Sequence, residues 1–178
     1  MYNKKSQGTT TMVRLIIIGL VVILGVILSI ENHEVYSISD IQPPNGKLLK
    51  PLLIPRFPGS PGIQTVRSFI KQIMLRNNWS FESDKFSAET PIGAVEFENL
   101  IFTTNSEAER RIILAAHYDS KYRTDDYNWR LGPDNFIGAT DSAWPTALLL
   151  YLANLISHFP PKNISLQIVF FDGEESIG

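Results

Sequence analysis

The sequence predicts an α/β fold in which helices flank a mixed, largely parallel sheet. Two short apolar runs, 111–116 and 164–171, each end in polar residues, and a helical pattern at 143–158 lies between them. A strand, a helix and a second strand in this order predict a right-handed βαβ unit, whose strands end at the same edge of the sheet. Open α/β sheets bind ligands at that edge, so the polar residues after the two strands are expected to meet there.

Three further segments complete the predicted domain. At 63–76, apolar residues recur at helical spacing, which predicts an amphipathic helix. Two alternating segments, 81–86 and 95–103, are predicted strands with a turn at 90–93 between them. The preceding segment, 51–62, holds four prolines and two glycines among apolar residues, which predicts a fixed loop docked on the domain.

An apolar run at 15–30 follows Lys4, Lys5 and Arg14, and acidic residues come after it. The run falls between the core of a signal peptide and the roughly 20 residues of a full transmembrane span. Because basic residues stay in the cytosol, the chain beyond the run is expected on the lumenal side. We therefore predict an uncleaved signal anchor and a single-pass type II membrane protein of the Golgi or endoplasmic reticulum. The alternative is secretion after signal cleavage.

The predicted organisation is a cytosolic tail at 1–14, the anchor at 15–30, a juxtamembrane linker at 31–50 and one domain at 51–178. Two sequons, at Asn78 and Asn163, are candidate glycosylation sites and agree with a lumenal domain. The chain has no cysteine, which excludes disulfides and thiolate metal sites, and its net charge of −2 gives no basic excess for binding nucleic acid.

Carboxylates and one histidine gather at the expected sheet edge. Three acids occupy 172–175, His117 and Asp119 follow the first strand, and Asp141 lies just before the helix. Each also has a purely structural alternative. The acids at 172–175 could form a solvated turn, and His117 could hydrogen-bond a neighbouring loop. Asp119 could close an Asx turn, and Asp141 could cap the helix. Crowded carboxylates repel one another unless a cation relieves them, and nitrogen and oxygen donors from separate segments suit zinc. The sequence therefore predicts a zinc site.

Four motifs make the chain resemble the glutaminyl-peptide cyclotransferases of the zinc aminopeptidase-like clan. They are Arg-Phe-Pro-Gly-Ser-Pro-Gly at 56–62, Ala-His-Tyr-Asp-Ser-Lys-Tyr at 116–122, Gly-Ala-Thr-Asp-Ser-Ala at 138–143 and Phe-Phe-Asp-Gly-Glu-Glu at 170–175. The resemblance runs from Leu52 to the last residue, which is less than half of such a domain. We therefore expect an incomplete, amino-terminal fragment of the domain.

The resemblance implies a role for each residue of the predicted site. Asp141 and Glu175 match zinc ligands, Glu174 matches the general acid/base, and His117 and Asp119 match supporting residues. One zinc ion is expected in the complete protein, with its third ligand beyond residue 178. The implied reaction converts the amino-terminal glutamine of peptides to pyroglutamate and releases ammonia.

Two other functions remain open at this point. One is a zinc aminopeptidase or peptide hydrolase of the same clan, in which the same glutamate activates a water molecule. The other is an inactive, membrane-anchored lumenal module. The expected partners are peptides or proteins with amino-terminal glutamine, and the membrane through 15–30. Because a ligand is expected beyond the chain, the fragment alone is expected to be inactive. Asp172 has no assigned role.

Overall fold

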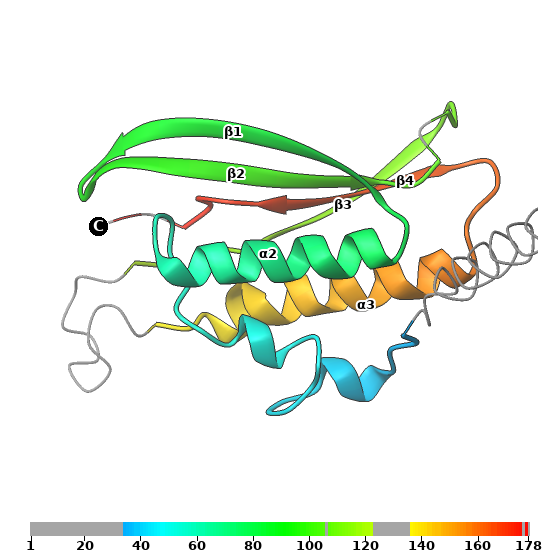
Figure 1. Ribbon diagram of the computed structural model, residues 1–178, viewed down its shortest axis with the longest axis horizontal. Helices are drawn as coiled ribbons and strands as arrows, with labels where there is room; N and C mark the ends of the chain where they lie inside the picture. The colour runs from blue at the N-terminus through cyan, green and yellow to red at the C-terminus, as the bar shows by residue number, and fades with distance from the viewer. Residues whose placement is uncertain (1–33, 106, 123–135, 176, 178) are drawn as a thin grey trace, which may run out of the picture. The chain divides into compact units, whose positions relative to one another are not determined.

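Four strands form one mixed sheet in the computed structural model, which describes residues 34–105, 107–122, 136–175 and 177 (Figure 1). The strands are β1 (Ser80–Thr90), β2 (Gly93–Thr103), β3 (Arg111–His117) and β4 (Ser165–Phe171), in the order β1-β2-β4-β3. Strands β3 and β4 pair in parallel, as predicted. The other two pairings, β1 with β2 and β2 with β4, are antiparallel.

The expectation of a largely parallel sheet is therefore wrong for the described residues. The reason lies in the connection between β1 and β2, which pair from Thr90 with Gly93 to Ser80 with Thr103. A connection this short joins only antiparallel strands, because a parallel pair needs a crossover of a dozen or more residues. The crossover between β3 and β4, which contains a helix, meets that requirement.

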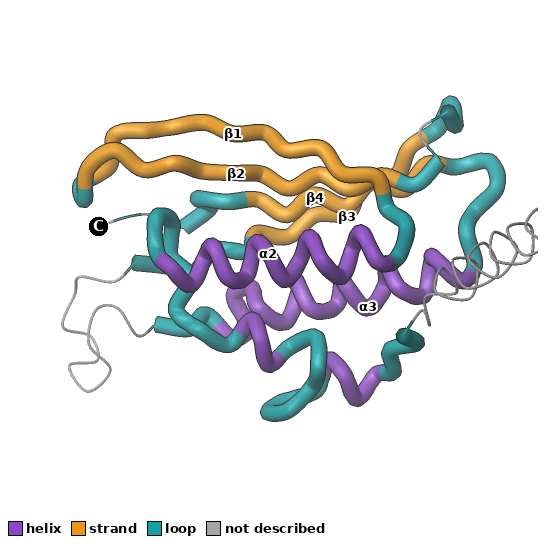
Figure 2. The backbone as a smooth tube through the Cα atoms, viewed as in Figure 1, coloured by secondary structure: helices purple, strands orange, loops and turns teal. Residues whose placement is uncertain are grey.

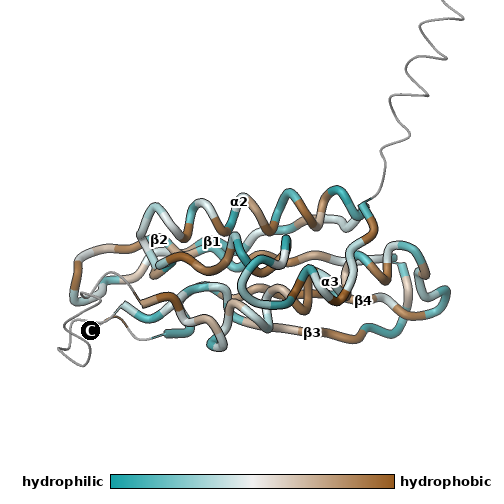
Figure 3. Tube along the Cα trace, turned by 90° about the horizontal axis from the view of Figure 1, so that it is seen from below, coloured by the Kyte–Doolittle hydropathy of each residue, from teal (hydrophilic) through white to brown (hydrophobic). Residues whose placement is uncertain are grey.

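Two helices, α2 (Pro61–Arg76) and α3 (Trp144–His158), lie side by side against one face of the sheet (Figures 1 and 2). Their bounds match the predicted helices to within two residues. Helix α2 begins after Ser60, whose side chain accepts a hydrogen bond from the Ile63 amide, and helix α3 has Pro145 in its first turn. Hydrophobic and hydrophilic residues alternate along α2 (Figure 3), and its buried residues face the core.

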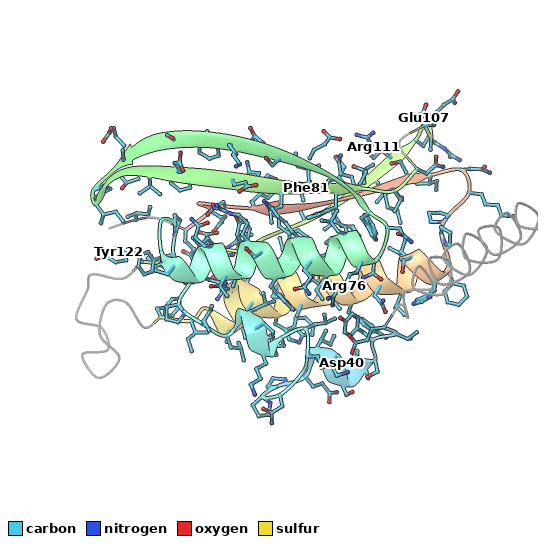
Figure 4. The ribbon with its side chains drawn as sticks, in the orientation of Figure 1. Asp40, Arg76, Phe81, Glu107, Arg111 and Tyr122 are labelled. Atoms are coloured by element: carbon cyan, nitrogen blue, oxygen red, sulfur yellow. The ribbon has the colours of Figure 1, made fainter. Side chains whose placement is uncertain are left out.

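The core lies between the helices and the sheet. Phe102 of β2 is at its centre, with ring centroids 5.0 Å from Phe81 of β1 and 6.1 Å from Phe170 of β4. Figure 4 labels Phe81 on the strand that crosses above α2. Side chains with no exposed surface complete the core: Leu52, Ile63, Val66, Ile70, Met74, Leu100, Ala147, Leu150 and Ile168.

The segment predicted as a linker contributes to this core. Residues 35–50 include the short 3-10 helix η1 (Ile38–Ile41), and four side chains of the segment are buried: Tyr36, Ile41, Leu48 and Leu49. The Tyr36 amide also donates a hydrogen bond of 3.0 Å to Asn154 Oδ1 of α3. The compact unit therefore starts at Val35, whereas the sequence placed the start of the domain at residue 51.

The predicted cytosolic tail and the anchor at 15–30 lie outside the described residues. Within the part of the chain that the structure describes, no helix is both long and apolar enough to cross a membrane. Both sequon asparagines, Asn78 and Asn163, are exposed. The anchor and the glycosylation sites therefore stay predictions.

The two apolar runs differ in burial. The run at 164–171 contains β4, which lies between β2 and β3 as predicted for a central strand. Strand β3 is at an edge of the described sheet, and Ile112 and Ile113 are 48% and 58% exposed. The prediction of a buried strand at 111–116 is therefore wrong for these two side chains, while Leu114 packs against the core.

Replacing Leu150 by alanine tests whether α3 is held by packing against the core. Leu150 has no exposed surface, so Leu150→Ala is expected to lower the free energy of unfolding by about 2 to 5 kcal/mol. The matched control is Leu75→Ala, because Leu75 is 51% exposed on α2 and should lose no more than about 0.5 kcal/mol. Urea denaturation measures both, and equal losses would contradict the packing described here.

Candidate metal and catalytic site

The parallel pairing of β3 with β4 brings two polar turns together. His117 is the last residue of β3 and pairs with Phe171, the last residue of β4. The Tyr118 amide also donates a hydrogen bond of 2.8 Å to the Phe171 carbonyl, so the strands stay in contact as they end. The residues predicted to meet at this edge therefore do so, since the chain enters 118–120 and 172–175 at adjacent points.

His117 is at the centre of the candidate site. Its Nε2 lies 2.8 Å from Asp141 Oδ1 and 3.9 Å from Glu174 Oε2, and its Nδ1 lies 3.2 Å from Asp119 Oδ1. Burial lowers the pKa of the imidazole, but the hydrogen bonds with Asp119 and Asp141 and the nearby carboxylates outweigh it and raise the pKa to about 9.

His117, Asp141 and Glu175 form the candidate metal group. One donor atom from each residue lies within 4.8 Å of the other two. One imidazole nitrogen and two carboxylate oxygens fit the ligand preference of zinc, so the residues present suit this metal. The structure thus brings together Asp141 and Glu175, the two predicted ligands, and adds His117, which was predicted to have only a supporting role. The assigned roles stay predictions.

Asp119 and Glu174 differ sharply in exposure. The side chain of Asp119 is fully buried, and its Oδ2 accepts a hydrogen bond of 3.1 Å from the Glu175 amide. This contact holds the second turn against the first. The side chain of Glu174 is 60% exposed, and its Oε2 lies 3.9 Å from His117 Nε2. The pKa of the Glu175 carboxyl is raised, mainly because the group is partly buried and secondly because Asp141 is nearby and carries the same charge.

Two glycines shape the backbone on either side of the metal group. Gly138 has φ 56°, and a Cβ at this position would lie 2.1 Å from the Asp141 carbonyl oxygen. Gly173 has φ 72°, and its Cβ would lie 2.5 Å from the ring of Phe97 on β2. A side chain at either position would displace the turn that carries a candidate ligand.

The structure bears on three of the structural alternatives to a site. Asp141 does not cap α3, which starts at Trp144 with Ala143 at the N-cap and no side-chain capping bond. Asp119 bonds the Glu175 amide in a distant segment, so it is no simple Asx turn. Asp172 is buried, so the acidic turn at 172–175 is only partly solvated.

Arg56 is a residue of this region whose role the sequence did not reveal. Its guanidinium is fully buried and donates only to backbone carbonyl groups in the described residues: Tyr118 at 2.8 Å, Gly138 at 3.1 Å, Leu52 at 3.2 Å, Ile54 at 3.5 Å, and Ile137. Burial lowers its pKa to about 10, against the opposing charges of Asp119, Asp141 and Glu175. Arg56 therefore ties the turn after β3 to the segment before Asp141. The available signal was one charged residue within the predicted loop 51–62.

Comparisons with known proteins agree with this fold. Residues 99–177 match the model of peptidase family M28. The solved structure of a zinc-dependent exopeptidase from Parabacteroides distasonis shares the fold, with a TM-score of 0.68 and 21% identity over 79% of this chain and 47% of that chain.

In sequence, the chain is similar to glutaminyl-peptide cyclotransferases. The enzyme of that name from Bos taurus is 46% identical over 141 residues, which cover 72% of this chain and 37% of the relative. The crystal structure of Macrostomum lignano glutaminyl cyclase matches with a TM-score of 0.63 and 38% identity, over 72% of this chain and 37% of that chain. The resemblance predicted from the four motifs is confirmed, and the chain spans 37% of the length of these two proteins.

The raised pKa of His117 predicts how stability depends on pH. Because the folded pKa of about 9 lies above the ordinary value of 6.5, the stabilisation by His117 is fully present below pH 6.5 and lost as the pH rises through about 9. In metal-free protein, the difference in free energy of unfolding between the wild type and His117→Gln should shrink between about pH 6 and about pH 10. Denaturant titrations at each pH measure it, and a constant difference would contradict this electrostatic role.

Proposed function

We propose that the protein cyclises the amino-terminal glutamine of peptides to pyroglutamate and releases ammonia, as the names of its relatives indicate. The observation that carries the proposal is the position of Glu174, an exposed carboxylate next to the candidate metal group. The chain spans 37% of the length of the Bos taurus relative, so the complete reaction is inferred for the protein as a whole.

The proposed reaction joins two groups of one glutamine residue. The α-amine nitrogen forms a bond to the side-chain carbonyl carbon, and the bond from that carbon to the amide nitrogen breaks. Zinc, when bound, would polarise the carbonyl group. Glu174 takes a proton from the α-amine and transfers it to the departing ammonia, so no water is consumed. Its exposure leaves room for a substrate, and its neighbour Glu175 points into the metal group.

The remaining site residues hold these two glutamates in place. Asp141 and Glu175 are the proposed zinc ligands, and His117 is near enough to both to join them or to orient Asp141. Asp119 fixes the Glu175 backbone through its amide. The two adjacent glutamates therefore have different proposed roles. Glu175 belongs to the candidate metal group, whereas Glu174 is exposed to solvent and open to a substrate.

Glu174→Gln tests the general acid/base role. The amide cannot accept the proton, so turnover of a glutaminyl peptide should fall by about 10²- to 10⁴-fold, while zinc binding is retained because the proposed ligands are intact. Steady-state kinetics in the longest natural form of the protein and calorimetric zinc titration measure the two effects. Glu96→Gln, at an exposed glutamate of β2, is the matched control. Unchanged turnover in Glu174→Gln would refute the role, and absent turnover and zinc binding in the wild type would favour an inactive module.

A second candidate function is a zinc aminopeptidase. The observation that favours it is the contact of His117 with both Asp119 and Asp141, which offers donors for a second metal ion. In that case Glu174 would activate a water molecule for hydrolysis. Metal analysis separates the two functions, because hydrolysis predicts two zinc ions per chain and a loss of the second in His117→Ala.

We also propose that the domain is lumenal, in a single-pass type II membrane protein of the secretory pathway. The apolar run at 15–30 with its preceding basic residues supports this location. The exposure of Asn78 and Asn163 supports it too, since a glycan needs an accessible asparagine.

Glycosylation provides the test of that location. In a eukaryotic host, the full chain should lose apparent mass after treatment with an N-glycosidase, and the double variant Asn78→Gln, Asn163→Gln should not. Replacing the exposed Asn45 instead would leave the shift unchanged, because Asn45 is outside any sequon. A wild-type chain that the glycosidase leaves unaltered would count against the lumenal proposal.

A further inference from the structure

Two buried side chains and one nearly buried side chain contact one another close to the candidate site. They are Arg67 of α2, Tyr118 of the turn after β3, and Asp172 of the turn after β4, and we call them the Arg67 group. Arg67 Nη2 lies 2.8 Å from Asp172 Oδ2, and Arg67 Nε donates a hydrogen bond of 2.9 Å to the Tyr118 hydroxyl. The Tyr118 hydroxyl in turn lies 3.1 Å from the same Asp172 oxygen. Each member therefore contacts the other two.

The Arg67 group is shielded from water. Tyr118 and the Asp172 side chain have no exposed surface, and the Arg67 side chain is 11% exposed. Asp172 Oδ2 also accepts a hydrogen bond of 3.0 Å from the Glu98 amide of β2, while Asp172 Oδ1 is buried without a partner among the described residues. Every contact of this carboxylate thus converges on one oxygen. Removing one member leaves buried polar groups uncompensated, which is costly in a water-excluded position.

Two members of the group are next to site residues in the chain. Tyr118 lies between His117 and Asp119, and Asp172 is followed by Gly173, Glu174 and Glu175. The Asp172 amide is fixed as well, by a hydrogen bond of 3.0 Å to a β2 side chain. A single arginine on a helix therefore holds the starting points of both turns, although 54 residues separate Tyr118 from Asp172.

We infer that the Arg67 group is a positioning element for the candidate site, acting through Tyr118 and Asp172 on the Glu174–Glu175 turn. None of its three members belongs to the metal group or is the proposed acid/base. Their effect reaches the site through the backbone and through the bond from the Glu175 amide to Asp119. The roles of Glu174 and Glu175 as positioned residues rest on the proposed function. The coupling of the two turns through the Arg67 group does not.

The alternative is that Arg67 is an ordinary ion-pair residue of the domain. Lys71, one turn further along α2, provides the matched comparison. Both residues pair with Glu98, Lys71 at 2.7 Å and Arg67 at 3.3 Å. Only Arg67 also bonds Tyr118 and Asp172. Arg67→Met and Lys71→Met each remove one positive charge and one ion pair with Glu98. Arg67→Met also removes the contacts with Tyr118 and Asp172, so a difference between the two variants reports on those contacts.

The experiment compares Arg67→Met and Tyr118→Phe with Lys71→Met in the full chain. The first readout is hydrogen exchange of the Glu175 amide by NMR, because this amide reports whether the second turn stays docked on Asp119. Relative to Lys71→Met, we expect exchange at least about tenfold faster in both test variants. Tyr118→Phe removes only a hydroxyl, so it serves if Arg67→Met does not fold. Arg67→Lys should restore little, because an ammonium lacks the planar fork that reaches two partners.

The second readout is zinc affinity by calorimetry. Loss of residues that hold metal ligands in place typically weakens metal binding by about 10- to 100-fold. Equal Glu175 exchange in the test variants and in Lys71→Met would overturn the inference, whatever the zinc result. If the longest natural form of the protein binds no zinc, the proposed function fails, but the exchange comparison still decides whether the Arg67 group positions the turn.

Discussion

The pairing of β3 with β4, from Arg111 with Ser165 to His117 with Phe171, is the constraint on which the candidate site depends. A shift of one residue would turn the side chains of β4 to the opposite face, and Ile168 and Phe170 would leave the core. The burial of these side chains therefore fixes the register. The same register sets where each strand ends, so core packing decides which polar residues become neighbours.

Charge is distributed so that each buried carboxylate has its own compensation. Asp172 pairs with Arg67, and Asp119 bonds His117 and the Glu175 amide. Each of these buried acids has at least one partner within the protein, although Asp172 Oδ1 has none among the described residues. The side chains of Asp141 and Glu174, by contrast, are 70% and 60% exposed. These two exposed carboxylates cost less to keep charged than a buried one, because water still solvates them.

Arg56 makes a different contribution, since its charge is satisfied by carbonyl dipoles instead of a carboxylate. A buried guanidinium of this kind needs every donor to be matched, and its fixed fork determines where the carbonyl groups lie. Two of these carbonyls, those of Tyr118 and Gly138, belong to segments that lead into Asp119 and Asp141. The arginine therefore stabilises the loops and leaves the carboxylates free for other contacts.

Local patterns predicted much of this structure, and long-range contacts account for what they missed. Apolar runs ending in acids located β4 and the edge where the site lies. The full length of β1 was missed because nearly all of its side chains are exposed, so backbone pairing with β2 extends it without a hydrophobic pattern. The core role of 35–50 was missed because its buried residues are scattered among prolines and glycines. The contacts of Arg56 with Tyr118 and of Asp172 with Tyr118 join residues 54 or more positions apart, and no local pattern indicates such contacts.

Gly173 lies so close to Phe97 that the residues allowed in the acidic turn depend on the hairpin formed by β1 and β2. Phe97 stacks on Phe86 of β1 with ring centroids 5.1 Å apart, so its ring has little freedom to retreat. A side chain could be accepted at residue 173 only after the ring at 97 had become smaller. The reverse order would pass through a displaced turn. Evolution toward a different turn beside Glu174 and Glu175 would thus have to begin on β2, at Phe97, which is not one of the candidate metal ligands.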